Sequence, residues 1–360
     1  MKLDIDPKKY IDIIKNHKNI IIVILFILII LAVLIYLFYN KIPRCIKNAN
    51  NIYRHCNELR SIEKDPILMK NDYRLCDFFI NSSYKSYLAC PNNYYASVDA
   101  LKMCLVNGCR YLDLDIYNKD FTTQTQPVVC YGKEVGNWHY SNVLCFDECC
   151  KTIADYAFSN YISNNSDPLF INLNLFVNHN YYTIDKIHDI LIKYFSHRIL
   201  SSKYSYQDGN LPEISIKDLI HKVVFICDNY EDLKSSKLNE IVNISSRNNE
   251  KLRTYEYNKL FNIECKCKID TTEELTEIKN FNKNHLTKIY NKDFENYNFY
   301  LPWYLGIQFI CMSYNHPTNY MVDYLNHFRV TSFVLKPYRL RKKTRYTPEK
   351  VKTPFYEIYY

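Results

Sequence analysis

The sequence predicts an α/β protein with one large domain, preceded by a transmembrane helix near the N-terminus. An uncharged apolar run lies near the N-terminus, and apolar strand candidates alternate with helical patterns from about residue 72 to 228. The 360 residues leave room for one α/β barrel once the apolar run is set aside. Buried parallel strands have near-continuous apolar sequences, because helices cover the outer face of the sheet.

The apolar run extends from Ile20 to Phe38 and contains no charged residue. At 1.5 Å per residue, about 19 residues form a helix of roughly 28 Å, which is close to the hydrocarbon thickness of a bilayer. A cleaved signal peptide is the competing interpretation, but the run is longer than a usual signal-peptide core and no small-residue cleavage pattern follows it. We therefore expect a single-pass signal anchor, preceded by a basic segment at residues 1–19.

Basic residues flank the run from Ile20 to Phe38 on both sides, so its orientation depends on a small difference. The flanking residues are Lys2, Lys8, Lys9, Lys15 and Lys18 before it, and Lys41, Arg44, Lys47 and Arg54 after it. This balance favours a cytosolic N-terminus. The large domain, with every cysteine from Cys45 to Cys311, would then lie on the lumenal or external side, where disulfides can form.

Glycosylation sequons and the overall charge add little to the choice of compartment or partner. Sequons occur at Asn81, Asn164 and Asn243, but a chain rich in asparagine produces them by chance. The net charge is +8, and a basic cluster at Arg339–Arg345 suits anionic lipid headgroups or forms a solvated tail. We expect a membrane partner and no nucleic-acid partner.

The segments from residue 39 to 228 differ in pattern. Residues 39–71 are mixed polar and apolar, and we expect a stalk or an extension that packs on the barrel. Val98–Val106 has helical spacing and is followed by Gly108, after which Tyr111–Tyr117 alternates with period two. Further strand candidates are Pro127–Tyr131, Pro168–Leu175 and Lys222–Cys227, and further helix candidates are Val143–Phe158 and Ile184–Leu200.

The second half of the chain is less regular. Residues 229–284 are rich in Ser, Asn, Lys and Glu with weak periodicity, so we expect a long insertion with some helix. Residues 285–341 contain strand candidates at Gly306–Met312 and Ser332–Leu335, and residues 342–360 form a basic tail.

Several short motifs in this order resemble the X and Y catalytic halves of eukaryotic-type phosphoinositide-specific phospholipase C. They are Ser82–Leu88, Gly108–Asp115, Lys288-Ile-Tyr290, Asn296-Tyr-Asn298, Trp303–Phe309 and Phe333–Arg341. The resemblance covers about residues 72–341. It implies a distorted TIM-type (β/α)8 barrel with an X-like half at 72–228, a linker at 229–284 and a Y-like half at 285–341.

Tyrosines occupy both positions that the resemblance assigns to catalytic histidines. The family pattern Ser-Ser-His-Asn-Thr-Tyr-Leu places Tyr84 at the first histidine, and the pattern Val-Tyr-His-Gly places Tyr131 at the second. The family's reaction needs a general base, a general acid and a cation. A free tyrosine has a pKa near 10, so it is a poor acid and base at neutral pH.

The family's calcium ligands are only partly present. Asp113 and Asp115 lie two apart on a predicted strand and so share one face, which suits a hard cation or a hydrogen-bonded barrel rim. In the resemblance both are calcium-ligand positions, while Lys85 and Asn174 occupy the other two. We hypothesise that the Lys85 ammonium takes the electrostatic role of calcium; the alternative is a lysine that points to solvent.

The resemblance also assigns phosphate contacts. Lys288 lies at a position where the family has a phosphate-binding arginine, whereas Ile226 and Asp228 occupy the positions of two phosphate-binding lysines. His139 and His179 are isolated in sequence and do not replace the missing pair. We interpret Cys149, Cys150, Cys265 and Cys267 as core residues or disulfide partners, because they lack the partner set of a zinc site.

These observations favour a membrane-anchored phospholipase C-like pseudoenzyme that acts by binding a phosphoinositide or a protein. No cofactor is expected. The first alternative is an active phosphoric diester hydrolase with unorthodox catalytic residues. Calcium is expected as a cofactor only under this alternative. The second is a structural or receptor-binding membrane protein of a virus or parasite.

Overall fold

Eight parallel strands form a nearly closed barrel at the centre of the structure, in the order β7-β6-β5-β2-β1-β10-β9-β8. The structure is a computed structural model that describes residues 17–56, 58–91, 94–132, 138–139, 141–205, 207, 209–227, 233–245, 251–260 and 271–342. The barrel strands are β1 (Phe78–Ser83), β2 (Tyr111–Asn118), β5 (Leu169–Phe176), β6 (Val223–Cys227), β7 (Val242–Ser245), β8 (Leu252–Glu256), β9 (Leu286–Tyr290) and β10 (Phe309–Met312). The predicted TIM-type fold is confirmed.

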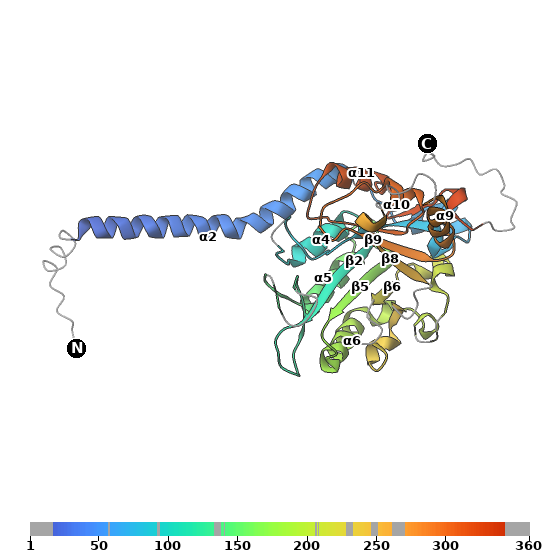
Figure 1. Ribbon diagram of the computed structural model, residues 1–360, viewed down its shortest axis with the longest axis horizontal. Coiled ribbons are helices and arrows are strands. Elements are labelled where there is room, and N and C mark those ends of the chain that lie inside the picture. The colour runs from blue at the N-terminus through green and yellow to red at the C-terminus, as the bar shows by residue number, and fades with distance from the viewer. Residues whose placement is uncertain are drawn as a thin grey trace.

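Helices cover the outside of this barrel (Figure 1). They are α3 (Pro66–Lys70), α4 (Val98–Val106), α5 (Phe146–Ala157), α6 (Tyr181–Phe195), α9 (Thr271–Phe281), α10 (Tyr300–Tyr304) and α11 (Asn319–His327). The Ser97 hydroxyl caps α4 by accepting a hydrogen bond from the Asp99 amide, and Gly108 at φ +84° follows its last turn. The chain then enters β2 directly, as the sequence pattern predicted.

Three short strands pair antiparallel, and one of them corrects a prediction. They are β3 (Pro127–Val129), β4 (Leu144–Cys145) and β11 (Phe333–Leu335). The segment Pro127–Tyr131 was expected as a strand of the parallel sheet, but β3 pairs antiparallel with β2 and β4. The connection at residues 119–126 is too short for the crossover that a parallel neighbour needs.

A second correction concerns residues 229–284, which were expected to form an insertion. This range contains β7 and β8, two strands of the barrel, as well as α9. Both strands are short, and only Ile244 and Leu252 from them join the buried core inside the barrel. Ser, Asn and Lys dominate the surrounding sequence, so no apolar run marks them.

The barrel interior changes from apolar to polar along its axis. Phe78, Ile80, Tyr111, Phe170 and Phe309 pack inside it, at the amino ends of their strands or toward them. Nearer the carboxyl ends, β2 and β5 carry polar inward positions instead. The polar layer therefore lies where the active sites of TIM barrels are built.

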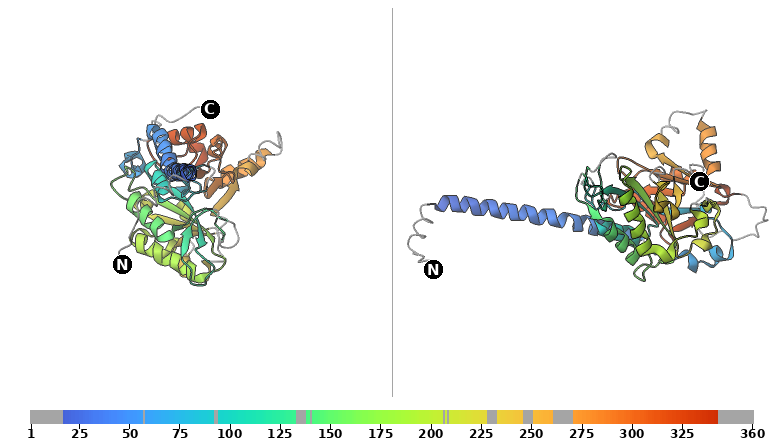
Figure 2. Two further views of the ribbon diagram at one scale, coloured as in Figure 1. Left: turned by 90° about the vertical axis from the view of Figure 1, so that its left-hand side faces the viewer. Right: turned by 90° about the horizontal axis from the view of Figure 1, so that it is seen from below.

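The N-terminal helix α2 (Lys18–Tyr53) projects far from the domain (Figures 1 and 2). It contains an 18-residue window with a mean hydropathy of 3.7, and the domain buries none of that window. A core helix of this composition would be buried. By length and composition α2 can cross a membrane, which supports the predicted single-pass anchor.

The second part of α2 packs on the barrel. Ile46, Ala49 and Tyr53 are buried, and the Tyr53 hydroxyl donates a hydrogen bond of 2.7 Å to the backbone oxygen of Tyr314. Pro43 lies inside the helix, and Figure 1 shows α2 bending close to the domain. The apolar segment and this packed segment are thus one helix.

Candidate functional site

The candidate site lies at the carboxyl ends of β1, β2 and β5. Asp113 and Asp115 on β2 stand beside Asn172 and Asn174 on β5, because the parallel register pairs Asp113 with Asn172 and Asp115 with Asn174. Lys85 follows β1 and reaches across to β2. The structure therefore brings together Lys85, Asp113, Asp115 and Asn174, the residues that the resemblance assigned to one cation site.

Lys85 is in direct contact with Asp115. Its Nζ lies 2.5 Å from each carboxylate oxygen of Asp115, and its backbone amide donates a 3.2 Å hydrogen bond to Oδ2 of Asp113. The side chains are 10% and 2% exposed for Lys85 and Asp115. Lys85 has φ +45°, an uncommon conformation for a residue with a Cβ. The alternative of a solvent-directed lysine is thus not what the structure shows.

Neutral donors complete the surroundings of the two carboxylates. The Tyr87 hydroxyl donates to Asp115 Oδ2 at 2.9 Å. The Asn174 amide lies across both groups, 2.8 Å from Asp115 Oδ1 and 3.0 Å from Asp113 Oδ1, and the Asn172 amide is 2.8 Å from Asp113 Oδ1. Buried carboxylates are tolerated when they are paired and hydrogen-bonded, as they are here.

The opposite charges in this cluster stabilise the charged form of Lys85. Burial works against the Lys85 ammonium, but the nearby carboxylates of Asp115 and Asp113 outweigh it and raise the pKa of Lys85. Burial raises the pKa of Asp115, and Lys85 opposes that rise. Because both Asp115 oxygens receive charged or neutral donors, we take the pair as an ammonium and a carboxylate.

An aromatic cluster lies beside this ion pair and includes both tyrosines at the histidine positions. Its members are Tyr84, Tyr94, Tyr131, Tyr290 and Phe294. Tyr84 stacks on Tyr290 at 5.1 Å between ring centroids, and Tyr131 stacks on Tyr94 at 4.5 Å. Phe294 joins the two stacks, with its ring 5.7 Å from Tyr84 and 5.2 Å from Tyr131.

Burial and two nearby carboxylates make Tyr84 a weaker proton-transfer group than a free tyrosine. Burial, followed by the negative charges of Asp113 and Asp115, raises the pKa of Tyr84 well above its ordinary value. The phenol therefore stays neutral at any physiological pH. It cannot act as a general base in that state.

Lys288 and Ile226 lie on other strands than the residues of the Lys85 cluster. Lys288 is 4% exposed on β9, which is separated from β1 by β10. Ile226 on β6 packs in the interior core, and Asp228 lies outside the described residues, as do Cys265 and Cys267. His139 and His179 are not part of the Lys85 cluster.

Sequence reasoning missed several residues of the site. Asn172 lies two positions before Asn174, so the period of a strand was a usable signal for it. Tyr87, Tyr290 and Phe294 carried no such signal, because their roles depend on how distant segments fold back to the barrel mouth.

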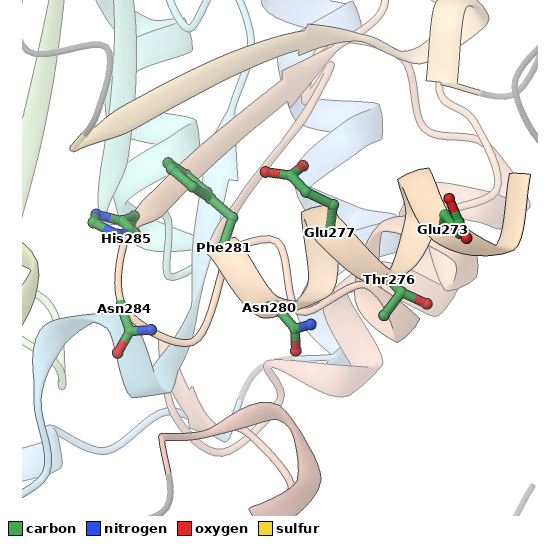
Figure 3. A pocket seen from close by; sticks show the side chains of 7 residues that line it. All are labelled: Glu273, Thr276, Glu277, Asn280, Phe281, Asn284 and His285. Atoms are coloured by element: carbon green, nitrogen blue, oxygen red, sulfur yellow. The ribbon is translucent and has the colours of Figure 1, made fainter.

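A separate pocket of about 560 Å³ lies along α9 and the turn that leads to β9 (Figure 3). It is lined by Glu273, Thr276, Glu277, Asn280, Phe281, Asn284 and His285. Arg253 borders it, with a 2.9 Å ion pair to Glu277 and its guanidinium 3.8 Å from the Phe281 ring centroid. The pocket contains none of the residues of the barrel-mouth cluster.

Comparisons with known proteins agree with the fold. The model of the phosphatidylinositol-specific phospholipase C X domain matches residues 71–228. The chain contains a phospholipase C-like phosphodiesterase domain. Among solved structures it is similar to PLC21 of L. pealei and PLC21 of S. officinalis, each with 18% identity and a TM-score of 0.60.

These structural similarities cover 76% of this chain, but only 39% of the L. pealei protein and 38% of the S. officinalis protein. The chain thus spans about two-fifths of their length. At this identity the similarity shows the fold alone. No curated protein matches the sequence.

The phospholipase C-like domain does not retain a site that fits calcium. Calcium takes six to eight oxygen ligands, most of them carboxylate, carbonyl or water oxygens. Here Asp113 and Asp115 remain, but an ammonium contacts both oxygens of Asp115 and an amide stands at position 174. In the part of the chain that the structure describes, no group of three or more His, Cys, Asp or Glu side chains is placed to hold a metal.

Proposed function

We propose that this chain is a membrane-anchored phospholipase C-like protein that does not hydrolyse phosphoinositides and that acts by binding a lipid or a protein. The observation that carries the proposal is the Lys85 ammonium, which lies on Asp115 where the resemblance expects a divalent cation. The barrel fold supports a binding site at this end of the strands. Lys85, Tyr84 and Tyr131 argue against hydrolysis of phosphoinositides there.

The reaction of the family requires groups that this site does not offer. Attack of a hydroxyl on phosphorus needs a base, an acid for the leaving group and a cation for the developing charge. Each proton-transfer group contributes roughly 10²- to 10⁴-fold to the rate. Two neutral phenols in place of two imidazoles, at Tyr84 and Tyr131, would remove most of that contribution.

The proposed orientation places the barrel on the lumenal or external side of the membrane. A disulfide between Cys45 and Cys90 supports it, because such bonds persist in oxidising compartments. The natural sequons give no further help, since Asn81, Asn164 and Asn243 are buried and inaccessible in the folded domain.

A hydrolysis assay on the full-length chain in mixed micelles tests the proposal. Phosphatidylinositol and phosphatidylinositol 4,5-bisphosphate are supplied with calcium, and we expect no turnover from the natural chain or from Asp115→Ala. Turnover that Asp115→Ala abolishes would instead establish an active phosphoric diester hydrolase.

The ligand class is tested separately. Binding of a soluble short-chain phosphatidylinositol 4,5-bisphosphate to the detergent-solubilised full chain is measured by calorimetry, with short-chain phosphatidylcholine as the control lipid. Selective binding of the phosphoinositide assigns the barrel to lipid recognition. Equal or no binding leaves a protein ligand, as the receptor-binding alternative requires.

A further inference from the structure

The disulfide between Cys45 and Cys90 joins the anchor helix to the mouth of the barrel. Cys45 lies on α2, and Cys90 lies in the segment between β1 and α4 that also contains Lys85 and Tyr87. The Cα atoms of the two cysteines are 5.5 Å apart. The side-chain amide of Asn315, which follows β10, donates a 3.0 Å hydrogen bond to the Cys90 carbonyl and ties this segment to a second strand end.

The contacts of α2 show which end of the barrel is closer to the membrane. Cys45 meets the carboxyl-end loop at Cys90, whereas Asn50, farther along the helix, accepts a 2.8 Å hydrogen bond from Asn107 at the last turn of α4. The chain runs from Asn107 into the amino end of β2. The helix therefore descends from the mouth of the barrel toward its base, and the membrane segment leaves from the mouth side (Figures 1 and 2).

The distance from the bilayer to the mouth is short. Cys45 is seven residues after Phe38, the end of the apolar run. At 1.5 Å per residue this is about 10 Å, while the headgroup layer on each side of a bilayer is roughly 5–8 Å thick. The loops at the mouth thus lie at the depth of the headgroups or just above it.

Exposed aromatic side chains are present on these loops. Phe121, on the connection after β2, is 79% exposed, and Trp138, on the loop between β3 and β4, is 64% exposed. Lys41, Arg44 and Lys47 are exposed on the neighbouring stretch of α2. Large aromatic and basic side chains are the types that favour the membrane interface.

We propose that the Cys45–Cys90 disulfide holds the mouth of the barrel against the bilayer that α2 spans, with Trp138 and Phe121 in its headgroup layer. The inference rests on the membrane anchoring in the proposed function. The mouth of the barrel would then be a second membrane-contacting surface besides α2, and it would contact the lipid headgroups of the same bilayer. The covalent link limits rotation of the domain about α2.

Tryptophan fluorescence tests this surface, because the chain has two tryptophans, Trp138 and Trp303. The full-length Trp303→Phe variant, in which Trp138 is the reporter, is reconstituted in phosphatidylcholine nanodiscs with and without bromine near the glycerol end of the acyl chains. We expect the brominated lipid to reduce Trp138 emission. The matched control is Trp138→Phe, because Trp303 stacks on Phe79 at 3.8 Å at the amino end of β1 and its emission should not change.

A second comparison tests the role of the disulfide. Cys45→Ser with Cys90→Ser, in the Trp303→Phe background, should show weaker quenching of Trp138 than the parent variant. Unquenched Trp138 in a chain that resists carbonate extraction overturns the inference and leaves the anchor intact, whereas loss of the chain on extraction overturns the anchoring itself. Equal quenching of Trp138 with and without the disulfide would show that the Cys45–Cys90 bond does not hold the mouth against the bilayer. Should the serine variant fail to fold, the comparison of Trp138 with Trp303 still decides the contact.

Discussion

The Nζ atom of Lys85 lies 2.5 Å from both carboxylate oxygens of Asp115, inside a barrel mouth where both side chains are almost fully buried. The Lys85 ammonium therefore lies at the position where the motif resemblance implies a calcium ion. The carboxylates of Asp113 and Asp115 on β2 need a positive partner, whether that partner is an ammonium or a metal ion. An ammonium balances one of these two carboxylate charges, but it does not supply the Lewis acidity of a metal ion.

Removal of the Lys85 ammonium should lower the free energy of unfolding. Lys85→Met leaves the Asp115 carboxylate buried without its cation, and breaking a buried pair in this way destabilises a protein by about 3–5 kcal/mol. Urea unfolding of the detergent-solubilised chain measures the change. The matched control is Lys102→Met, since Lys102 forms a half-exposed pair with Asp99 and such pairs contribute about 0–1 kcal/mol.

The double variant Lys85→Met with Asp115→Leu separates charge from packing. Because it removes both charges, it should recover a large part of the stability that Lys85→Met loses. If Lys85→Met and Lys102→Met have the same small effect, the ion pair of Lys85 is not a structural element of the mouth.

Phe294 should tolerate glycine better than alanine. Its φ of +60° is unfavourable for a residue with a Cβ, and it holds its ring between Tyr84 and Tyr131. Both substitutions remove the ring contacts, but only alanine keeps the backbone strain, so Phe294→Ala should be less stable than Phe294→Gly by about 1 kcal/mol. Thermal unfolding of the two variants side by side measures this; a more stable alanine variant contradicts the backbone geometry.

Lys336 should make stability depend on pH. Burial lowers the pKa of Lys336 to about 7, and its Nζ donates a 3.0 Å hydrogen bond to the Asn282 carbonyl. Between that value and the unfolded pKa near 10.4, the unfolded chain holds a proton that the folded chain lacks, so stability rises with pH by up to about 1.4 kcal/mol per unit. Below about pH 7 this dependence ends.

The window for this measurement is pH 7 to about 8.5. Free cysteines, whose pKa is near 8.5, titrate in the upper part of this window, but they are the same in both chains and their contribution cancels in the comparison. Urea unfolding of the natural chain is compared with that of Lys336→Met, which keeps the length of the side chain without the amine. The natural chain should gain stability across the window relative to the variant. Parallel curves for the two chains would show that Lys336 is charged in the fold.

Orientation in the membrane can be read with a sequon placed at an accessible position. Lys203 is exposed on the connection between α6 and β6, and Lys203→Asn creates a sequon with Ser205. Synthesis with microsomes should give this variant one more glycan than the natural chain, because the domain is expected on the lumenal side and Lys203 is exposed. Modification absent from Lys203→Asn but present on a sequon placed before the membrane segment would reverse the orientation.

The barrel was predictable where the chain repeats a simple pattern. Strand β2 was expected at Tyr111–Tyr117 and spans Tyr111–Asn118, and its period of two placed Asp113 and Asp115 on one face. Strand β3 was misplaced, because sequence alone does not show that the segment after β2 turns back as a hairpin. Strands β7 and β8 escaped detection because each is short and lies in polar sequence.

The site was predictable only in part, for a related reason. Lys85 and Asp115 lie in two motifs that resemble those of the family, and the resemblance assigns both positions to one cation site. Phe294 reaches the mouth from a loop after β9, and the pairing of Cys45 with Cys90 depends on how α2 packs. With 14 cysteines in the chain, spacing alone does not select a pair.

Calcium titration by calorimetry tests the central claim most directly. The detergent-solubilised full-length chain is compared with Asp115→Ala and with Lys85→Asn carrying Asn174→Glu, which replaces the ammonium and restores a carboxylate. The account predicts no heat of calcium binding from the natural chain or from Asp115→Ala, and binding by the double variant. Tight calcium binding by the natural chain that is lost in Asp115→Ala would contradict the account, because Lys85 would then not occupy the cation position.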